Sequence, residues 1–167
     1  MPMKFLSLFA ITLLFCCCQP AVKEDPQPQN EPLVLENQAD IDAVKHLIEG
    51  SFQEIWSDLD TSRILTYHTD DFILLEQGLV WNNDSIARYL LEEQKRREEV
   101  QYQRLNRFDY VRSVQRQNTI WVAYKNYGTW VKGSDTLGTA QWLESAIAIR
   151  ENDQWKIQQL HSTRMEK

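Results

Sequence analysis

Two ionisable side chains are candidates for a functional pocket. Glu76 ends an apolar run, and His161 lies near the C-terminus. A carboxylate and an imidazole that face one cavity can act as general base and general acid, because enzymes shift both groups toward neutral pKa values. The alternative is a strand-end carboxylate open to water and an imidazole in a core or interface with one satisfied hydrogen bond. We favour this alternative for both residues, and Gln77 and Gly78, directly after Glu76, indicate a strand end.

Two further residues are candidates for the wall of a pocket. An indole such as Trp56 more often fills a core than holds a ligand, although a cavity lined by indoles suits an apolar guest. Asn126 occupies a strand position that faces neither bulk solvent nor charge, so core and pocket are equally good interpretations of it. The predicted pocket residues are therefore Trp56, Glu76, Asn126 and His161. The catalytic alternative uses Glu76 together with His161.

The sequence offers no recognisable metal or cofactor site. His46, His68 and His161 lack the short spacings that place two imidazoles, or an imidazole and a carboxylate, on one metal. All three cysteines are adjacent at positions 16–18, so the rest of the chain has no cysteine for a disulfide or a thiolate-bound metal. We therefore expect no cofactor, and a domain held by its hydrophobic core alone.

The length and the net charge of the chain limit the classes of function that it can have. A chain of 167 residues with 43% hydrophobic residues is long enough for one domain of ordinary size. Its formal net charge is −6, and the arginines from Arg96 to Arg116, Arg104 included, are interleaved with acidic residues, which is typical of a solvated face. Binding to nucleic acid needs a clustered basic surface that neutralises phosphates. We expect no nucleic-acid partner.

The first residues resemble a bacterial lipoprotein signal peptide. The apolar run at residues 5–15 is shorter than the ~20 residues that a membrane-spanning helix needs. The run LFCC at positions 14–17 resembles the signal that directs cleavage and lipid transfer to a cysteine, here Cys17 or, failing that, Cys18. A plain secretory peptide is the alternative. We predict a signal peptide over residues 1–17 and a lipid anchor at Cys17, which would add about 0.8 kcal/mol of membrane binding per buried methylene.

Residues 18–36 are predicted to be a tether. They are rich in proline, charged and amide residues, which cannot bury a core and favour an extended, semi-rigid chain. The Lys23-Glu24-Asp25 cluster loosely resembles the export signal of surface lipoproteins in the Bacteroidetes. We therefore expect the protein in the cell envelope, anchored to a membrane by lipid, in the periplasm or exposed at the cell surface.

Residues 37–167 have the pattern of an α+β domain. Apolar residues at three-four spacing over residues 41–59 predict a long amphipathic helix, with Asp40 as its N-cap. A short helix, a short strand and a helix over residues 85–99 follow, and the last places Glu93 on its solvent side. Strands with period-two alternation are then expected at residues 102–115, 119–131, 141–150 and 155–162. This order predicts an antiparallel sheet that wraps one side of the helices.

The orientation of the last strand decides where His161 points. Strict alternation places Ile157 and His161 on one face of the sheet, and Leu160 and Ser162 on the other. The pattern does not say which face is concave, and a single bulge would reverse the assignment.

In this order the elements resemble the nuclear transport factor two-like (NTF2-like) superfamily, in its SnoaL-like and ketosteroid-isomerase-like branch. The residues that carry the resemblance are Asp60, Ile64, Leu65, Tyr67, Asp70, Asp71, Phe72, Gly78, Trp81, Ser85, Trp155, Ile157, His161 and Thr163. The resemblance implies a cone-shaped, curved antiparallel sheet around N-terminal helices, a roll also described as cystatin-like. It further implies a ligand pocket at the open end of the cone and dimers formed through the sheet.

The catalytic groups of ketosteroid isomerases are only partly matched. In those enzymes a carboxylate moves the proton, while a tyrosine and a protonated aspartate stabilise the oxyanion. The resemblance places the carboxylate at Glu76, but it places the two donors at Phe52 and Ile147, whose side chains donate no hydrogen bond. Losing such a donor typically costs ~10²–10³ in rate. Steroid isomerisation is therefore disfavoured.

Two function classes remain. We favour a membrane-anchored, non-catalytic binding or accessory module, in which the cone holds a small apolar ligand and the protein dimerises through its sheet. In this class Glu76 titrates as an ordinary carboxylate. The alternative is a SnoaL-like isomerase, lyase or hydrolase that uses Glu76 and His161 as acid and base. Whether these two side chains point into one cavity separates the two classes.

Overall fold

The computed structural model describes residues 37–166. The predicted signal peptide (residues 1–17, with Cys17) and tether (residues 18–36) lie outside the described residues. In chain order the elements are α1 (Gln38–Ser51), η1 (Phe52–Ser57), η2 (Thr61–Arg63), α2 (Ile64–Tyr67), β1 (His68–Glu76), β2 (Leu79–Trp81), α3 (Asn83–Val100), β3 (Gln103–Arg116), β4 (Thr119–Lys132), β5 (Asp135–Glu151) and β6 (Gln154–Arg164). Within this described part of the chain, no helix is long and apolar enough to cross a membrane.

The six strands form one curved, open sheet in the order β2-β1-β6-β5-β4-β3. Neighbouring strands run antiparallel except β1 and β6, which are parallel. The predicted α+β class is confirmed, and so is the alternation along β4, where Ile120, Val122 and Tyr124 are fully buried. Asn152 and Asp153 join β5 to β6 with positive φ angles of 48° and 62°, as the predicted tight turn requires.

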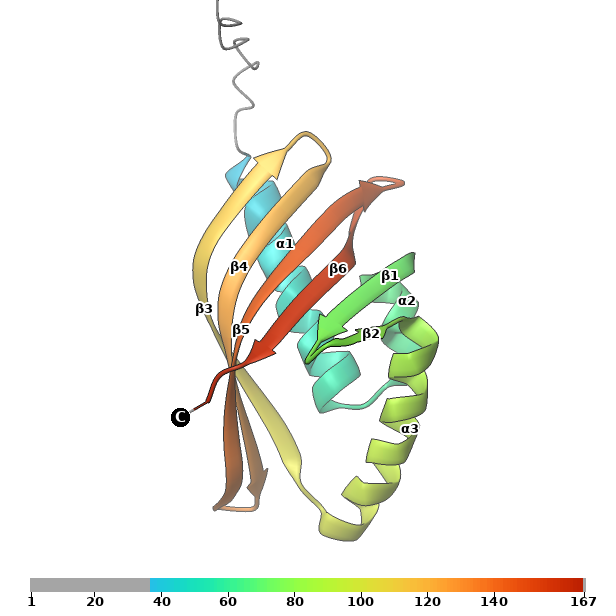
Figure 1. Ribbon diagram of the computed structural model, residues 1–167, viewed down its shortest axis with the longest axis vertical. Helices are drawn as coiled ribbons and strands as arrows, with labels where there is room; N and C mark the ends of the chain where they lie inside the picture. Colours follow the sequence, from blue (N-terminus) through green and yellow to red (C-terminus); the bar gives the residue numbers. More distant parts are fainter. Residues whose placement is uncertain (1–36, 167) are drawn as a thin grey trace, which may run out of the picture. The chain divides into compact units, whose positions relative to one another are not determined.

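Helix α1 lies along the concave side of the sheet, with α3 beside the β1–β2 edge (Figure 1). Ile41, Val44 and Ile48, one face of α1, form a single buried cluster with inward side chains of the sheet such as Tyr124 and Ala146. The three-four spacing that predicts this helix is therefore the spacing of its core contacts.

The predicted single helix over residues 41–59 is wrong in its second half. α1 ends at Ser51, and the backbone continues as the π-helical segment η1. There the Asp58 N–H donates to the Gln53 carbonyl at 2.8 Å, one residue farther back than an α-helix would place the acceptor. Side-chain periodicity does not distinguish the two kinds of turn over so short a segment.

Asp40 is not the N-cap that the sequence predicts, because Asn37 takes that role by accepting from the Ala39 N–H. The Asp40 carboxylate instead joins α1 to the sheet. Arg150 pairs with it, and Trp155 Nε1 and Gln115 Nε2 donate to it at 3.4 Å and 3.1 Å. Burial opposes ionisation, but these hydrogen bonds and the Arg150 charge outweigh it and lower the pKa of Asp40. We call these four residues the Asp40 cluster.

Glu93 is buried, although the helical pattern predicts it on the solvent side of α3. It pairs with Arg96, three residues on, and accepts a hydrogen bond from the Tyr102 hydroxyl. Tyr102 follows the left-handed Gln101 that ends α3, so the contact fixes the corner between α3 and β3. The periodicity places Glu93 on the outer face of the helix, and only the returning chain covers it.

Candidate functional site

A cavity opens between the concave face of the sheet and the helices, at the opposite end of α1 from the Asp40 cluster. We call it the cone. Its volume is about 320 Å³, which lies in the usual range for small-molecule sites. Its apolar wall includes the indoles of Trp56, Trp81, Trp130 and Trp142. Its polar groups include Glu76, Arg104, Glu144, Ser162 and Arg164.

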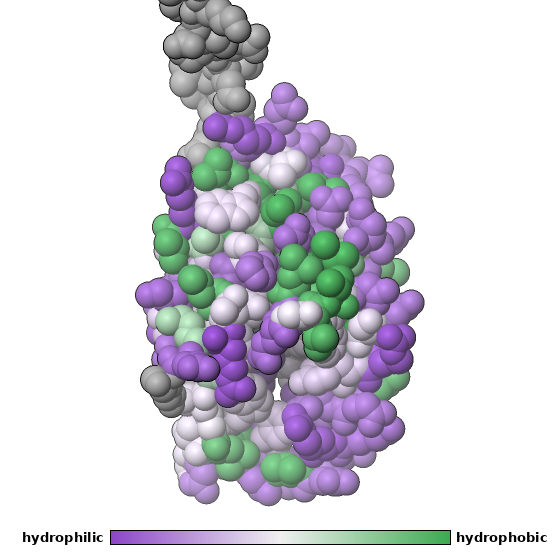
Figure 2. All heavy atoms as spheres, viewed as in Figure 1, coloured by the Kyte–Doolittle hydropathy of each residue, from purple (hydrophilic) through white to green (hydrophobic). Residues whose placement is uncertain are grey.

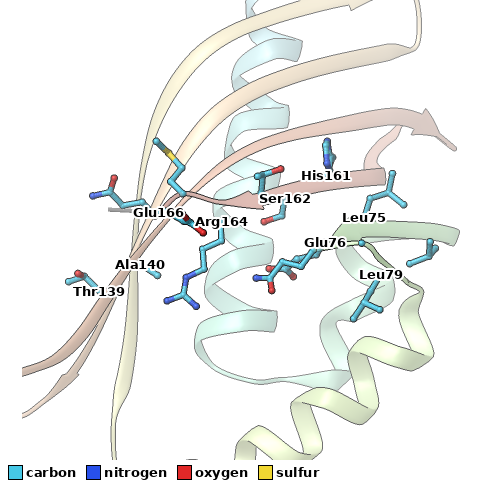
Figure 3. A pocket seen from close by; sticks show the side chains of 15 residues that line it. Leu75, Glu76, Leu79, Thr139, Ala140, His161, Ser162, Arg164 and Glu166 are labelled. Carbon is cyan, nitrogen blue, oxygen red and sulfur yellow. The ribbon is translucent and has the colours of Figure 1, made fainter.

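An open groove of about 1100 Å³ runs past the mouth of the cone. The β1–β2 turn, the start of β5 and the end of β6 line it (Figure 3). Glu76, Ser162 and Arg164 border both spaces, whereas His161 borders only the groove. Because the aromatic wall and the buried charges belong to the cone, we assign the candidate site there and not to the larger groove.

A bulge in β6 decides which side chains enter the cone. Gln158 lies between the residues that pair with Ile147 and Ala148 and has no partner of its own. As a result Ile157 and Leu160 are both buried, although strict alternation places them on opposite faces. Ser162 then points inward and His161 outward, where its side chain is exposed.

Glu76 and His161 are therefore not brought together. In the parallel pairing of β1 with β6, Leu75 is the partner of His161 and Glu76 the partner of Ser162. Paired residues share a face of the sheet, so Glu76 and His161 lie on opposite faces. Figure 3 shows His161 on one side of β6 and Arg164 on the other. A ligand atom inside the cone therefore cannot contact both side chains.

Glu76 lies at the mouth of the cone, and its environment differs from the open strand end that the sequence predicts. Burial raises the pKa of Glu76, and attraction by Arg104 and Arg164 offsets this only in part. Its carboxylate is thus harder to ionise than an ordinary one.

Trp56 and Asn126 are also placed by the structure. Trp56 lines the cone from η1, next to Tyr89 of α3 at 6.1 Å between ring centroids. Asn126 is fully buried and touches the site through Glu144, to whose Oε2 its amide donates at 3.2 Å. Asn126 thus positions a cone residue.

The sequence analysis missed Glu144, the most deeply buried acid of the cone. Its carboxylate accepts hydrogen bonds from Ser162 Oγ at 2.9 Å and from Asn126 Nδ2. Asn126 accepts in turn from Asn106, and Asn106 from Ser57. Burial is the main cause that raises the pKa of Glu144 to about 7. These hydrogen bonds and the Arg104 charge lower the pKa, but by less than burial raises it. The sequence does contain a signal for Glu144. The alternating row of β5 to which this carboxylate belongs otherwise holds Trp142, Ala146 and Ala148, and it faces inward.

Arg104 was also missed, because the interleaved charges around it predict a solvated face. It lies near the start of β3 and lines the cone, and its guanidinium carbon is 5.3 Å from the ring centre of Trp142. Burial lowers the pKa of Arg104, although Glu144, Tyr89, Glu76 and Glu93 counteract this.

The positions implied for oxyanion donors do not supply them. Phe52 lines the cone without a hydrogen-bonding group, and Ile147 faces outward from β5 in the row opposite Glu144 and Ala146. Within residues 37–166, no group of three or more His, Cys, Asp or Glu side chains is placed to hold a metal ion.

Comparison with known proteins identifies the fold. No family model matches the sequence, and no curated protein matches it. Among solved structures, ActVI-ORFA from Streptomyces coelicolor aligns with a TM-score of 0.66 at 14% identity, over 78% of this chain and 98% of that one. An NTF2-like protein from Cytophaga hutchinsonii aligns with a TM-score of 0.55 at 12% identity, over 78% of this chain and 100% of that one.

A protein with a cystatin-like fold from Caulobacter vibrioides gives a TM-score of 0.55 at 14% identity, over 75% of this chain and 89% of that one. At such identities the likeness shows the fold alone. The fold is NTF2-like, with a curved, unclosed six-stranded sheet, as the resemblance in the sequence implies.

We predict that Glu144 makes the folded protein less stable as the pH rises. A carboxyl whose folded pKa is raised stabilises the fold below its unfolded pKa of 4.5 and loses that contribution as the pH rises through about 7. The loss is on the order of 3 kcal/mol. Urea unfolding between these pH values should show a steeper loss of stability for the wild type than for Glu144→Gln. Glu151→Gln, at the exposed last residue of β5, is the control that should follow the wild type.

Parallel pH profiles for the wild type and Glu144→Gln would show that Glu144 has the same pKa in the folded and the unfolded protein, which would contradict a raised pKa.

Proposed function

We propose that this protein is a binding module of the cell envelope, whose cone holds a small, mostly apolar ligand. The observation that carries the proposal is the cone, a cavity of about 320 Å³ with four indoles in its wall. Small-molecule sites are typically concave and mostly apolar, with a few convergent polar groups that orient the ligand. Glu76, Arg104 and Glu144 are such groups here.

Acid–base catalysis is the second candidate. A pair of Glu76 and His161 has little support, since the two lie on opposite faces of the sheet. Glu144 supports catalysis better, because a buried carboxyl with a pKa of about 7 suits a general acid or base. Solvent deuterium that enters a bound ligand in the wild type but not in Glu144→Gln would place catalysis first.

The proposed homodimer uses the outer face of the sheet. Ile73, Trp121 and Leu143 lie on this face and are 37%, 38% and 50% exposed. Figure 2, which views the sheet from this side, shows hydrophobic side chains gathered over β1 and β6. Exposed apolar patches of this kind often mark interfaces. Leu143→Glu should convert the dimer to a monomer in sedimentation experiments, and a wild type that is already monomeric at micromolar concentration contradicts the proposal.

Ligand binding by the cone is tested by filling it. Ala140, a small residue of its wall, becomes bulkier in Ala140→Leu and should weaken binding of the neutral fluorophore N-phenyl-1-naphthylamine by about tenfold or more, since the side chain occupies ligand volume. Ala123→Leu adds the same volume on the outer face of β4 and serves as the matched control. Fluorescence titration gives both affinities. Equal effects of the two substitutions, or no saturable binding by the wild type, would contradict a pocket in the cone.

The lipid anchor is tested at the N-terminus of the mature protein. Mass spectrometry should find a diacylglycerol-modified Cys17, and Cys17→Ser should abolish membrane association, whereas Cys18→Ser should keep it. The reason is that lipid transfer requires the thiol of the cysteine at the cleavage site. An unmodified N-terminus beyond Cys18, with the protein soluble after lysis, would contradict the anchor and the envelope location with it.

A further inference from the structure

The Arg104 side chain lines the cone and is only partly exposed to solvent. Its Nε is shielded from solvent and donates to no other group. Across residues 37–166, no hydrogen bond or salt bridge to this side chain is present. Almost all buried N–H groups in folded proteins are hydrogen-bonded, so a buried Nε without an acceptor is unusual. A fold that keeps Arg104 in this place therefore points to an acceptor from outside the chain.

Aromatic rings hold the guanidinium in place. Its carbon lies over the rings of Trp142, Trp130 and Phe52, at 5.3 Å, 5.5 Å and 5.9 Å from their centres. Such contacts use the faces of the rings and stabilise the charge, but they accept few of its N–H donors. The arginine is thus positioned by the wall of the cone while its hydrogen-bonding edge stays available.

The nearby carboxylates do not neutralise Arg104. Glu144 and Glu76 attract it electrostatically, but the Arg104 Nε donates a hydrogen bond to neither. The Glu144 carboxylate is already engaged by Ser162 and Asn126. The cone therefore combines an unpaired cation with an apolar wall.

Taking the binding role of the cone as given, we propose that its ligand is a monocarboxylate: the carboxylate pairs with Arg104, and a flat apolar body lies among the indoles. The planar fork of a guanidinium matches a carboxylate through two parallel hydrogen bonds. A second negative charge on the ligand would be repelled by Glu76, which lines the same space. Flat rings suit a wall that includes Trp56, Trp81 and Trp130.

Glu144 makes this recognition depend on pH. The titratable and polar groups around it are Arg104 of β3, Tyr124 and Asn126 of β4, and Ser162 of β6, with Glu76, Tyr89 and Arg164 lining the same cavity. When Glu144 is neutral, it adds no negative charge beside Arg104, and the guanidinium attracts an anionic ligand. When Glu144 ionises, it repels the ligand and competes for Arg104. Affinity for a carboxylate should therefore fall as the pH rises through about 7.

Isothermal titration of the purified full chain with 2-naphthoate and 2-naphthamide tests the inference. The two probes share size and shape, and only the first is charged. At about pH 6 the wild type should bind naphthoate roughly 10–100-fold more tightly, the factor expected of a charge-assisted hydrogen-bonded pair. Arg104→Met should remove this preference and leave naphthamide binding unchanged. Arg112→Met, an exposed arginine of the same strand, should change neither affinity.

The pH dependence of binding gives a second test, which does not need the Arg104 variant. Between about pH 6 and about pH 8 the naphthoate affinity of the wild type should fall several-fold while naphthamide affinity stays constant, because only the charged probe senses Glu144. Equal binding of both probes by the wild type at about pH 6 would overturn the carboxylate inference and leave the cone a binding site. If neither probe binds, the proposed binding function fails as well. If Arg104→Met does not fold, the wild-type comparison and its pH dependence decide.

Discussion

The packing of α1 against only one end of the concave sheet determines where the cone forms. Ile41, Val44 and Ile48 cover the inward side chains at that end, and the Asp40 cluster fixes the helix there. Farther along, Phe52 and Trp56 of η1 face the cavity. A curved sheet presents more concave surface than one helix covers, so the remaining inward residues must either fill a space or line one. Here large aromatic side chains line it.

Several polar groups at the cone form one hydrogen-bonded network, and Arg104 is not part of it. Ser57, Asn106, Asn126, Glu144 and Ser162 form a line of hydrogen bonds that begins on η1 and crosses four strands. Each member restricts the next, which holds the Glu144 carboxylate in one orientation although its burial opposes ionisation. Arg104 lies beside this line without joining it. The contrast between a completed network and an unpaired cation is the strongest indication that the cone serves a ligand and is more than a packing defect.

The sequence predicts the elements and their order because local patterns encode them. Three-four spacing identifies α1, and period-two alternation identifies β4 together with the inward position of Asn126. The site is harder to predict, since it depends on relations between strands. Because of the bulge at Gln158, Ser162 and not His161 lies on the concave face, and no local pattern in the sequence reveals this bulge. Glu144 and Arg104 carry charges that normally predict solvent exposure, so only the assembled sheet places them in the cone.

The most direct test of this account is a high-resolution crystal structure of the full chain, grown near pH 6 without an added ligand. The account predicts an open cone in which Arg104 stacks on Trp130 and Trp142 and binds only solvent or a small anion, with Glu144 held by Ser162 and Asn126. A salt bridge from Arg104 to Glu144 or Glu76, with the indoles collapsed into the cavity, would contradict it. In that case the cone would be a core with a buried ion pair, and the case for a ligand would be lost.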